Sequence, residues 1–173
     1  MNSFSVLVID DEPSQVHSLK TFLSRRGLEA FTASGGEEGY QIAREQTVNL
    51  VLTDFRMPDW SGAEVLERVK ELNPEIEVIV ITAYGSIEDA VNLMKAGAYD
   101  YLTKPIDLDE LENLIKRVQE KQALVAENRQ LREQLQERFK FDSIVSQSGE
   151  MEEVLNTASR VAGSRATVLI RGE

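Results

Sequence analysis

The sequence predicts an α/β protein in which about the first 120 residues form a doubly wound, five-stranded parallel sheet with helices on both faces. Five short apolar runs alternate with stretches in which apolar residues recur at helical spacing. The runs at 6–9, 50–53 and 78–82 are nearly continuous in Val, Ile and Leu, as in strands buried on both faces. Four runs lead into a polar residue. Because ligands bind beyond the carboxyl ends of such strands, we expect these polar residues to share one site.

The strands are expected at residues 6–9, 29–32, 50–53, 78–82 and 99–102. Helical apolar stripes separate them at residues 16–23, 40–43, 65–72 and 90–96. Gly27, Asn73-Pro74 and Gly97 mark the ends of the first, third and fourth helices. The only histidine, His17, is expected on the solvated side of the first helix, so a phosphodonor or metal role is not expected for it. Strict alternation of strand and helix indicates a parallel sheet with right-handed crossovers.

Composition excludes several classes of function. The chain has 173 residues, enough for one domain of ordinary size and an appendage. It contains no cysteine, which excludes disulfides, thiolate metal sites and thiol catalysis. Its net charge of −11 argues against direct nucleic-acid binding, because that affinity depends on Lys and Arg. No signal-peptide pattern or membrane-spanning run is recognised, so we expect a cytoplasmic protein without a membrane partner.

Acidic residues at the strand ends predict a divalent cation site. Asp10 and Asp11 follow the first strand, and Asp54 follows the third. Three carboxylates in one crevice would repel one another unless a cation neutralised them, and oxygen ligands without His or Cys suit Mg²⁺. Because Mg²⁺ uses few protein ligands, one carboxylate remains free to attack a phosphoryl group and form an aspartyl phosphate. We expect Asp54 to be this phosphoacceptor, since it stands alone at its strand end.

Two further strand-end residues suit a phosphoryl group. Lys104, after the fifth strand, would neutralise its oxygens, and the Thr82 hydroxyl, at the end of the fourth, would hydrogen-bond another. Each residue alone has a simpler interpretation: the Asp10-Asp11 pair could favour a helix N-terminus, and Thr82 could cap a helix. Tyr101 could be a core aromatic residue. The conjunction favours the phosphoryl site, because helix capping requires no lysine at the fifth strand.

These residues, with Asp54 inside the segment DFRMPDWSG, closely resemble the receiver domains of two-component response regulators. The resemblance implies a flavodoxin-like (CheY-like) fold with strand order 2-1-3-4-5. It also implies that a sensor histidine kinase phosphorylates Asp54. Its implied Mg²⁺ ligands are Asp11, Asp54 and the backbone carbonyl of Arg56, with Asp10 acting through water.

The same resemblance implies roles at the last two strands. Lys104 would pair with the phosphoryl group, and the Lys104-Pro105 peptide bond would be cis. Thr82 and Tyr101 match the switch pair of the family. On phosphorylation, Thr82 would move toward the phosphate and Tyr101 would turn inward. The surface formed by the fourth helix, fifth strand and fifth helix would then change.

The fifth helix is expected to continue well past the sheet, because no helix-breaking residue occurs between residues 108 and 141. Beyond its core stripe, four residues are spaced four, three and four apart: Leu124, Asn128, Leu131 and Leu135. This spacing predicts a coiled-coil seam over 121–140 with Asn128 at an a position, which favours a parallel homodimer. Arg117 and Lys121 occupy the upstream seam positions, so the coil is short. The alternative is a single amphipathic helix that packs on its own domain.

The last segment carries a second pattern. A helical stretch at 148–161 precedes an apolar run at 166–170, which leads into Gly172-Glu173. This order resembles the start of the AAA+ ATPase domain in NtrC-like, sigma-54-dependent activators, where such a strand leads into a phosphate-binding loop. The Lys and Ser/Thr of that loop are not in the chain, so ATP hydrolysis is not expected. We therefore expect a fragment: a receiver over 1–120, a linker over 121–140, and a truncated ATPase segment over 141–173.

The favoured function is a phosphorylation-dependent response regulator that is not itself an enzyme and controls a sigma-54 activator through a dimeric linker. A full-length protein of this kind implies sigma-54 RNA polymerase and DNA as partners. Two alternatives stay open. One is a Mg²⁺-dependent phosphatase with an aspartyl-phosphate intermediate, although such enzymes favour an Asp-x-Asp spacing and here the acidic pair is adjacent and separate from Asp54. The other is a receiver-like dimerisation scaffold that is not phosphorylated.

Overall fold

The computed structural model describes residues 4–83, 87–138, 148–162 and 169. They fall in two units, Met1–Val125 and Ala126–Glu173, each described by itself below. The strands are β1 (Ser5–Ile9), β2 (Glu29–Ala33), β3 (Leu50–Asp54), β4 (Glu77–Thr82) and β5 (Asp100–Thr103). The helices are α1 (Pro13–Arg25), α2 (Gly36–Glu45), α3 (Gly62–Leu72), α4 (Ile87–Lys95), α5 (Leu108–Arg138) and α6 (Gly149–Ala162). The predicted α/β alternation is confirmed.

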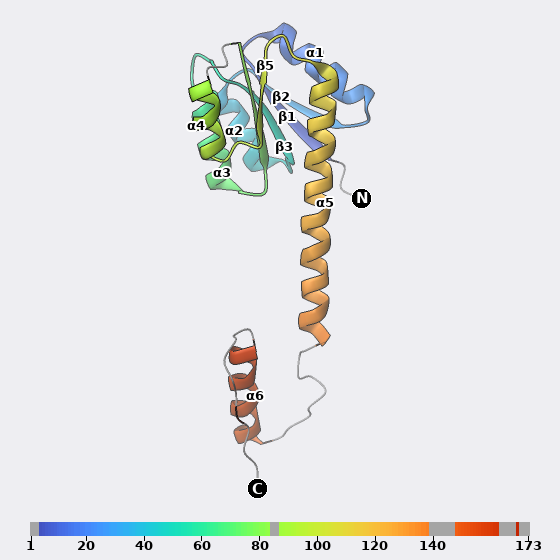
Figure 1. Ribbon diagram of the computed structural model, residues 1–173, viewed down its shortest axis with the longest axis vertical. Coiled ribbons are helices and arrows are strands. Elements are labelled where there is room, and N and C mark those ends of the chain that lie inside the picture. Colours follow the sequence, from blue (N-terminus) through green and yellow to red (C-terminus); the bar gives the residue numbers. More distant parts are fainter. Residues whose placement is uncertain (1–3, 84–86, 139–147, 163–168, 170–173) are drawn as a thin grey trace. The chain divides into compact units, whose positions relative to one another are not determined.

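The sheet of the first unit is parallel, with the order β2-β1-β3-β4-β5 that the resemblance implied. Helices cover both of its faces (Figure 1). In the register, Ile9 lies beside Thr53, Asp54 beside Ile81, and Thr82 beside Thr103. Four strands therefore end at one edge of the sheet, which we call the carboxyl edge. The opposite edge, where β4 begins at Glu77, is the amino edge.

Two hydrophobic cores explain why the central strands are continuous apolar runs. Val6 and Val8 face the core under α1 and α5, whereas Leu7 and Ile9 face the core under α2, α3 and α4. Neighbouring strand residues point to opposite faces. All residues of β1, β3 and β4 are therefore buried, and strand alternation between polar and apolar residues is lost.

Helix ends follow the local sequence. Pro13 occupies the first turn of α1, where its missing N–H is not needed. Gly27, just beyond the last turn of α1, has a φ of 73°, a backbone conformation that L side chains rarely adopt. At the start of α3, the Ser61 hydroxyl accepts from Glu64 N, and the Glu64 side chain accepts in return from Ser61 N. This reciprocal capping box fixes the point where the loop after β3 becomes a helix.

Helix α5 runs well past the core, as predicted. Its first turns bury four apolar residues, Leu111, Leu114, Ile115 and Val118. Every residue from 123 to 134 is exposed. Leu124 and Leu131 are 66% and 52% exposed, and Asn128 is exposed as well. The Leu135 side chain lies outside the described residues. In this single chain, the predicted seam positions whose side chains are described are therefore unburied.

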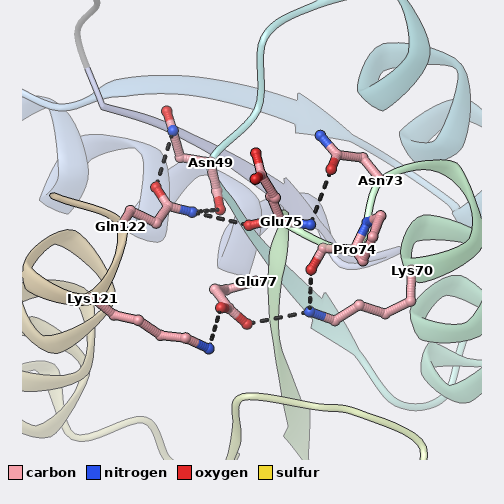
Figure 2. Close-up of polar contacts among 8 residues, drawn as sticks. All are labelled: Asn49, Lys70, Asn73, Pro74, Glu75, Glu77, Lys121 and Gln122. Carbon is pink, nitrogen blue, oxygen red and sulfur yellow. Dashed lines mark hydrogen bonds and ion pairs between the residues drawn. The ribbon is translucent and has the colours of Figure 1, made fainter. Parts of the chain in front are cut away.

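A polar cluster fixes α5 at the amino edge of the sheet, and Figure 2 shows it in close-up. Lys121 Nζ lies 2.6 Å from Glu77 Oε1, and Lys70 Nζ of α3 lies 3.2 Å from Glu77 Oε2. Gln122 Nε2 donates to the carbonyls of Asn49 (2.9 Å) and Glu75 (3.2 Å), and Asn49 Nδ2 donates to Gln122 Oε1. We call this group the amino-edge cluster.

This cluster gives Lys121, which the heptad pattern places at an upstream seam position, a partner within its own chain. The Lys121 ammonium instead pairs with the carboxylate at the start of β4 and lies 5.4 Å from the centre of the Tyr99 ring. A heptad pattern cannot show this pairing, because it describes one helix and not the surface beneath it. Leu124, the first leucine of the predicted seam, is exposed in this chain.

The second unit contains α6, which confirms the predicted helical stretch at 148–161 within about one residue at each end. The buried strand predicted at 166–170 falls outside the described residues except for Leu169, which has no regular secondary structure and is 76% exposed. Among the described residues, no helix is both long and apolar enough to span a membrane.

Candidate functional site at the carboxyl edge of the sheet

Three of the predicted site residues meet at the carboxyl edge. Asp10 directly follows β1, Asp54 is the last residue of β3, and Lys104 directly follows β5. Lys104 Nζ lies 2.5 Å from Asp54 Oδ1 and 3.1 Å from Asp10 Oδ2. The two carboxylates are almost completely buried, and the lysine is mostly buried. Residues 94 positions apart in the chain are thus brought within hydrogen-bond distance by the parallel sheet.

Both oxygens of the Asp54 carboxylate are oriented by neighbours. Oδ1 receives the Lys104 ammonium, and Oδ2 accepts a 2.8 Å hydrogen bond from the backbone N–H of Arg56. An ionised carboxylate has about four lone-pair sites. Two are used by these contacts, so lone pairs remain on a fixed and pre-oriented group. The arrangement is suited to nucleophilic attack or to metal ligation from a constant position.

The charge at this edge is unbalanced toward the negative. Burial raises the pKa of Asp10 and the nearby Asp54 adds to the rise, although hydrogen bonds from Glu12 N and Lys104 oppose it. Burial would lower the pKa of Lys104, but hydrogen bonds and attraction to Asp54 and Asp10 outweigh this and raise it. Lys104 is therefore charged at neutral pH. With both carboxylates ionised, two negative groups share one positive group, and a further cation would be stabilised.

The donor set fits Mg²⁺, which is commonly held by one or two carboxylates and retains several waters. Asp10 and Asp54 supply two carboxylates at one place, since both contact the same ammonium. The third predicted ligand, Asp11, is exposed. Within the described part of the chain, no group of three or more acidic or histidine side chains is arranged to hold a metal. The structure thus offers a two-carboxylate site, and the ligand role of Asp11 stays a prediction.

The last two strands place the other predicted residues. Thr82, the last residue of β4, is buried, and its carbonyl accepts a 2.8 Å hydrogen bond from Lys104 N. This bond ties the lysine to the end of β4. The Lys104-Pro105 peptide bond is cis, as the resemblance implied. Tyr101 is 36% exposed and lines a shallow apolar hollow with Val91 and Met94 of α4.

The loop after Asp54 is held closed by short-range contacts. Gly62 N donates a 2.9 Å hydrogen bond to the Phe55 carbonyl, so the loop between β3 and α3 returns to its starting point. A Cβ on Gly62 would lie 2.6 Å from the Asp54 carbonyl oxygen, a distance that no side chain tolerates. Glycine at this position therefore permits the close return of the loop beside Asp54.

Sequence reasoning assigned no role to Asp59 in this loop. Asp59 Oδ2 accepts a 3.0 Å hydrogen bond from Glu37 N, in the first turn of α2. Burial would raise the Asp59 pKa, but hydrogen bonds from backbone amides, that of Glu37 foremost, hold it below its ordinary value. The two residues are 22 positions apart, so no local signal could have found the contact. Of the remaining candidates, Arg56 is exposed, and His17 is exposed on α1 as predicted.

Comparison with known proteins agrees with this geometry. A family model described as the response regulator receiver domain matches residues 6–116, which is more than half of the chain. The chain therefore belongs to the response regulator receiver domain family. A solved receiver domain from Clostridium thermocellum has a TM-score of 0.68 and 35% identity, covering 70% of this chain and 98% of its own.

Two curated relatives from Escherichia coli K12 match the chain beyond its receiver. The transcriptional regulatory protein ZraR is 36% identical over 173 residues, covering 99% of this chain, and the regulatory protein AtoC is 32% identical over 168 residues, covering 97%. The chain spans 38% and 36% of the length of these two relatives. Their similarity therefore includes the long helix and the segment after it.

Proposed function

We propose that Asp54 accepts a phosphoryl group from the phosphohistidine of a sensor histidine kinase. A carboxylate oxygen of Asp54 attacks the phosphorus, the P–N bond breaks, and its electron pair returns to the imidazole, which takes up a proton. The observation that carries the proposal is the shared contact of Lys104 with Asp54 and Asp10 at a buried strand end. The Lys104 ammonium is placed to stabilise charge on the oxygens of the transferred group.

Mg²⁺ is the expected cofactor of this site. Asp10, Asp11, Asp54 and the backbone carbonyl of Arg56 would hold it, with Asp10 acting through water. When bound, it supplies positive charge to the phosphoryl oxygens and to the crowded carboxylates. Without it, Lys104 alone faces both carboxylates. A phosphoryl group would add negative charge to this site. We therefore propose that the site accepts it only when the cation is bound.

The signal would leave the site through Thr82 and Tyr101. Thr82 is buried beside the Lys104 backbone, within reach of the same strand ends, while the Tyr101 ring is partly exposed against α4. We propose that Thr82 moves toward the phosphoryl group and that Tyr101 then turns inward. The surface formed by α4, β5 and α5 changes as a result.

The output would pass through a dimeric linker. Exposed Leu124 and Leu131, with Asn128 between them and Leu135 beyond, form the proposed coiled-coil seam of a homodimer. Relatives named as transcriptional regulators match through this region, which supports control of a sigma-54-dependent activator. In the full-length cytoplasmic protein, sigma-54 RNA polymerase and DNA are the proposed partners, although this acidic chain does not bind nucleic acid itself.

A phosphorylation assay tests the proposal. The chain is incubated with Mg²⁺ and acetyl phosphate, and intact mass is measured before and after acid or hydroxylamine treatment. We expect one labile phosphate per chain, which Asp54→Asn removes. Persistence of the label in Asp54→Asn contradicts the assignment of Asp54. Continuous phosphate release from several phosphomonoesters would instead support the phosphatase alternative.

Light scattering on the same samples tests the linker. We expect a dimer mass that falls in Leu131→Ala, because this residue lies at the centre of the exposed seam. A monomer at every concentration contradicts the proposed coil. An unchanging dimer that neither takes up phosphate nor binds Mg²⁺ would favour the scaffold alternative.

A further inference from the structure

The loop between β3 and α3 is attached to a second element of the fold at its centre. Asp59 Oδ2 receives the amide of Glu37, close to the N-terminus of α2. The residue before α2, Gly35, has an extended backbone and no side chain with which to cap the helix. An α-helix leaves its first amides without partners in the helix, and a carboxylate is among the strongest caps for them. Asp59 thus caps a helix to which it does not belong.

Apolar packing reinforces this attachment one residue further on. A Cβ on Gly36, the first residue of α2, would lie 2.7 Å from Trp60 Cβ. The Trp60 ring lies 5.8 Å from the Tyr40 ring of α2, and the Arg68 guanidinium of α3 lies 4.2 Å above it. The centre of the loop therefore rests directly on the first turns of α2. Polar and apolar contacts hold it there together.

The beginning of the same loop orients the phosphoacceptor. Arg56 N donates to Asp54 Oδ2, three residues before Asp59. The far end of the loop is closed by Gly62 N, which donates to the Phe55 carbonyl. This closure and the contact of Asp59 with α2 restrict local movement of the short loop at its base and at its centre.

We propose that Asp59 is a positioning residue for phosphorylation, acting through its hydrogen bond to the first turn of α2 to keep the Arg56 amide directed at the Asp54 carboxylate. This inference rests on the proposed function, because it concerns the rate at which Asp54 takes up a phosphoryl group. In this proposal, the carboxylate oxygen of Asp59 acts as a hydrogen-bond acceptor, and its negative charge is not required for the effect on the phosphorylation rate.

Three variants separate this role from a general electrostatic one. Asp59→Ala removes the acceptor, whereas Asp59→Asn keeps an oxygen that can cap the helix and removes the charge. Glu38→Ala is the matched control: Glu38 borders the same surface hollow, and its carboxylate accepts hydrogen bonds from Ser34 N and Oγ. Acetyl phosphate with Mg²⁺ gives the second-order rate constant of phosphorylation for each variant.

We expect Asp59→Ala to slow phosphorylation by about three- to ten-fold, as small misplacements of reacting groups do. Asp59→Asn should stay within about two-fold of the unaltered chain, and so should Glu38→Ala. Equal rates for Asp59→Ala and the unaltered chain would overturn the proposal. So would an Asp59→Asn variant as slow as Asp59→Ala, or a Glu38→Ala variant that slows equally.

Amide hydrogen exchange followed by NMR gives a readout that does not depend on phosphorylation. Asp59→Ala should accelerate exchange at the amides of Glu37 and Arg56. The midpoint of global unfolding, measured for each variant, shows whether the variant is folded. Glu38→Ala should accelerate neither. If the unaltered chain takes up no phosphate, the proposed function fails, while exchange still reports on the attachment. If phosphorylation occurs but Arg56 exchange is unchanged in Asp59→Ala, the positioning role alone fails.

Discussion

The two edges of the same sheet each bury a carboxylate beside lysine, with opposite balances of charge. At the carboxyl edge, Asp10 and Asp54 share the single ammonium of Lys104. At the amino edge, Glu77 is paired with two ammonium groups, those of Lys70 and Lys121 (Figure 2). The first group has a surplus of negative charge and the second a surplus of positive charge. Yet the three carboxylates all lie at, or directly after, an end of a strand of this sheet.

This difference in charge balance matches the proposed phosphorylation site at the carboxyl edge and a structural role at the amino edge. A buried carboxylate needs compensation, and Glu77 obtains it from α3 and α5, so the two helices are fixed to the start of β4. The carboxyl edge is left short of one positive charge, and burial raises the pKa of Asp10. A site of this kind is stabilised by an added cation. Charge balance thus supports the proposed ligand chemistry at the carboxyl edge and accounts for helix attachment at the amino edge.

The largest effect is expected from removing the lysine at each edge. Lys104→Met leaves Asp10 and Asp54 facing each other without a counter-charge, and it should lower the free energy of unfolding at neutral pH by about 3 kcal/mol. Lys121→Met is the matched control and should cost less than about 1 kcal/mol, because Lys121 is 53% exposed and Glu77 keeps Lys70. Urea unfolding measures both.

Magnesium should distinguish the same two variants. Mg²⁺ should restore part of the loss in Lys104→Met, because it supplies the positive charge that the lysine provided. It should not restore stability in Lys121→Met. Equal losses in the two variants, or equal rescue by Mg²⁺, would show that charge balance does not distinguish the edges.

Removing one carboxylate from each edge should have opposite effects. Asp10→Asn leaves Lys104 balanced by Asp54 alone and should raise the free energy of unfolding at pH 7 by about 1 kcal/mol. Glu77→Gln leaves two lysines without their carboxylate and should lower it by about 1 to 2 kcal/mol. Thermal and urea unfolding check the signs, and destabilisation by Asp10→Asn at pH 7 would contradict this account.

The stabilisation by Asp10→Asn should also depend on pH. The pKa of Asp10 is raised above its ordinary value of 3.8 in the folded protein, so folding favours the neutral carboxyl. Ionising Asp10 costs the folded protein no stability below pH 3.8, and the cost develops as the pH rises through the raised pKa. The advantage of the variant should therefore be complete at neutral pH and disappear in acid. A constant difference across this pH range would contradict the assigned cause.

The sequence predicted the carboxyl edge better than the amino edge, and the reason is physical. Asp54 and Lys104 directly follow or end apolar strand runs, and parallel topology then brings them together without knowledge of side-chain contacts. Glu77 instead receives lysines that lie 7 and 44 residues away, one of which also fits a heptad pattern. Asp59 likewise depends on a helix 22 residues earlier. Such contacts follow from the packing of helices on the sheet, which periodicity does not specify.

The smallest effect is expected at Gln122, where α5 leaves the sheet. Gln122→Ala removes two donated hydrogen bonds, to the carbonyls of Asn49 and Glu75, and one that its side chain accepts from Asn49 Nδ2. Because water can reach this part-exposed position, the loss of global stability should stay below about 1 kcal/mol. Amide exchange at residues 119–125 should nevertheless accelerate, since the helix loses its attachment beside Glu77.

Gln130→Ala is the matched control on the same helix, because Gln130 is exposed and the substitution favours helix equally at both positions. It should leave exchange at residues 119–125 unchanged, and neither variant should alter the phosphorylation rate. Slower phosphorylation in Gln122→Ala would show that the two edges are coupled through the sheet. Unchanged exchange would show that buried Leu111, Leu114, Ile115 and Val118 hold α5 without the amino-edge cluster.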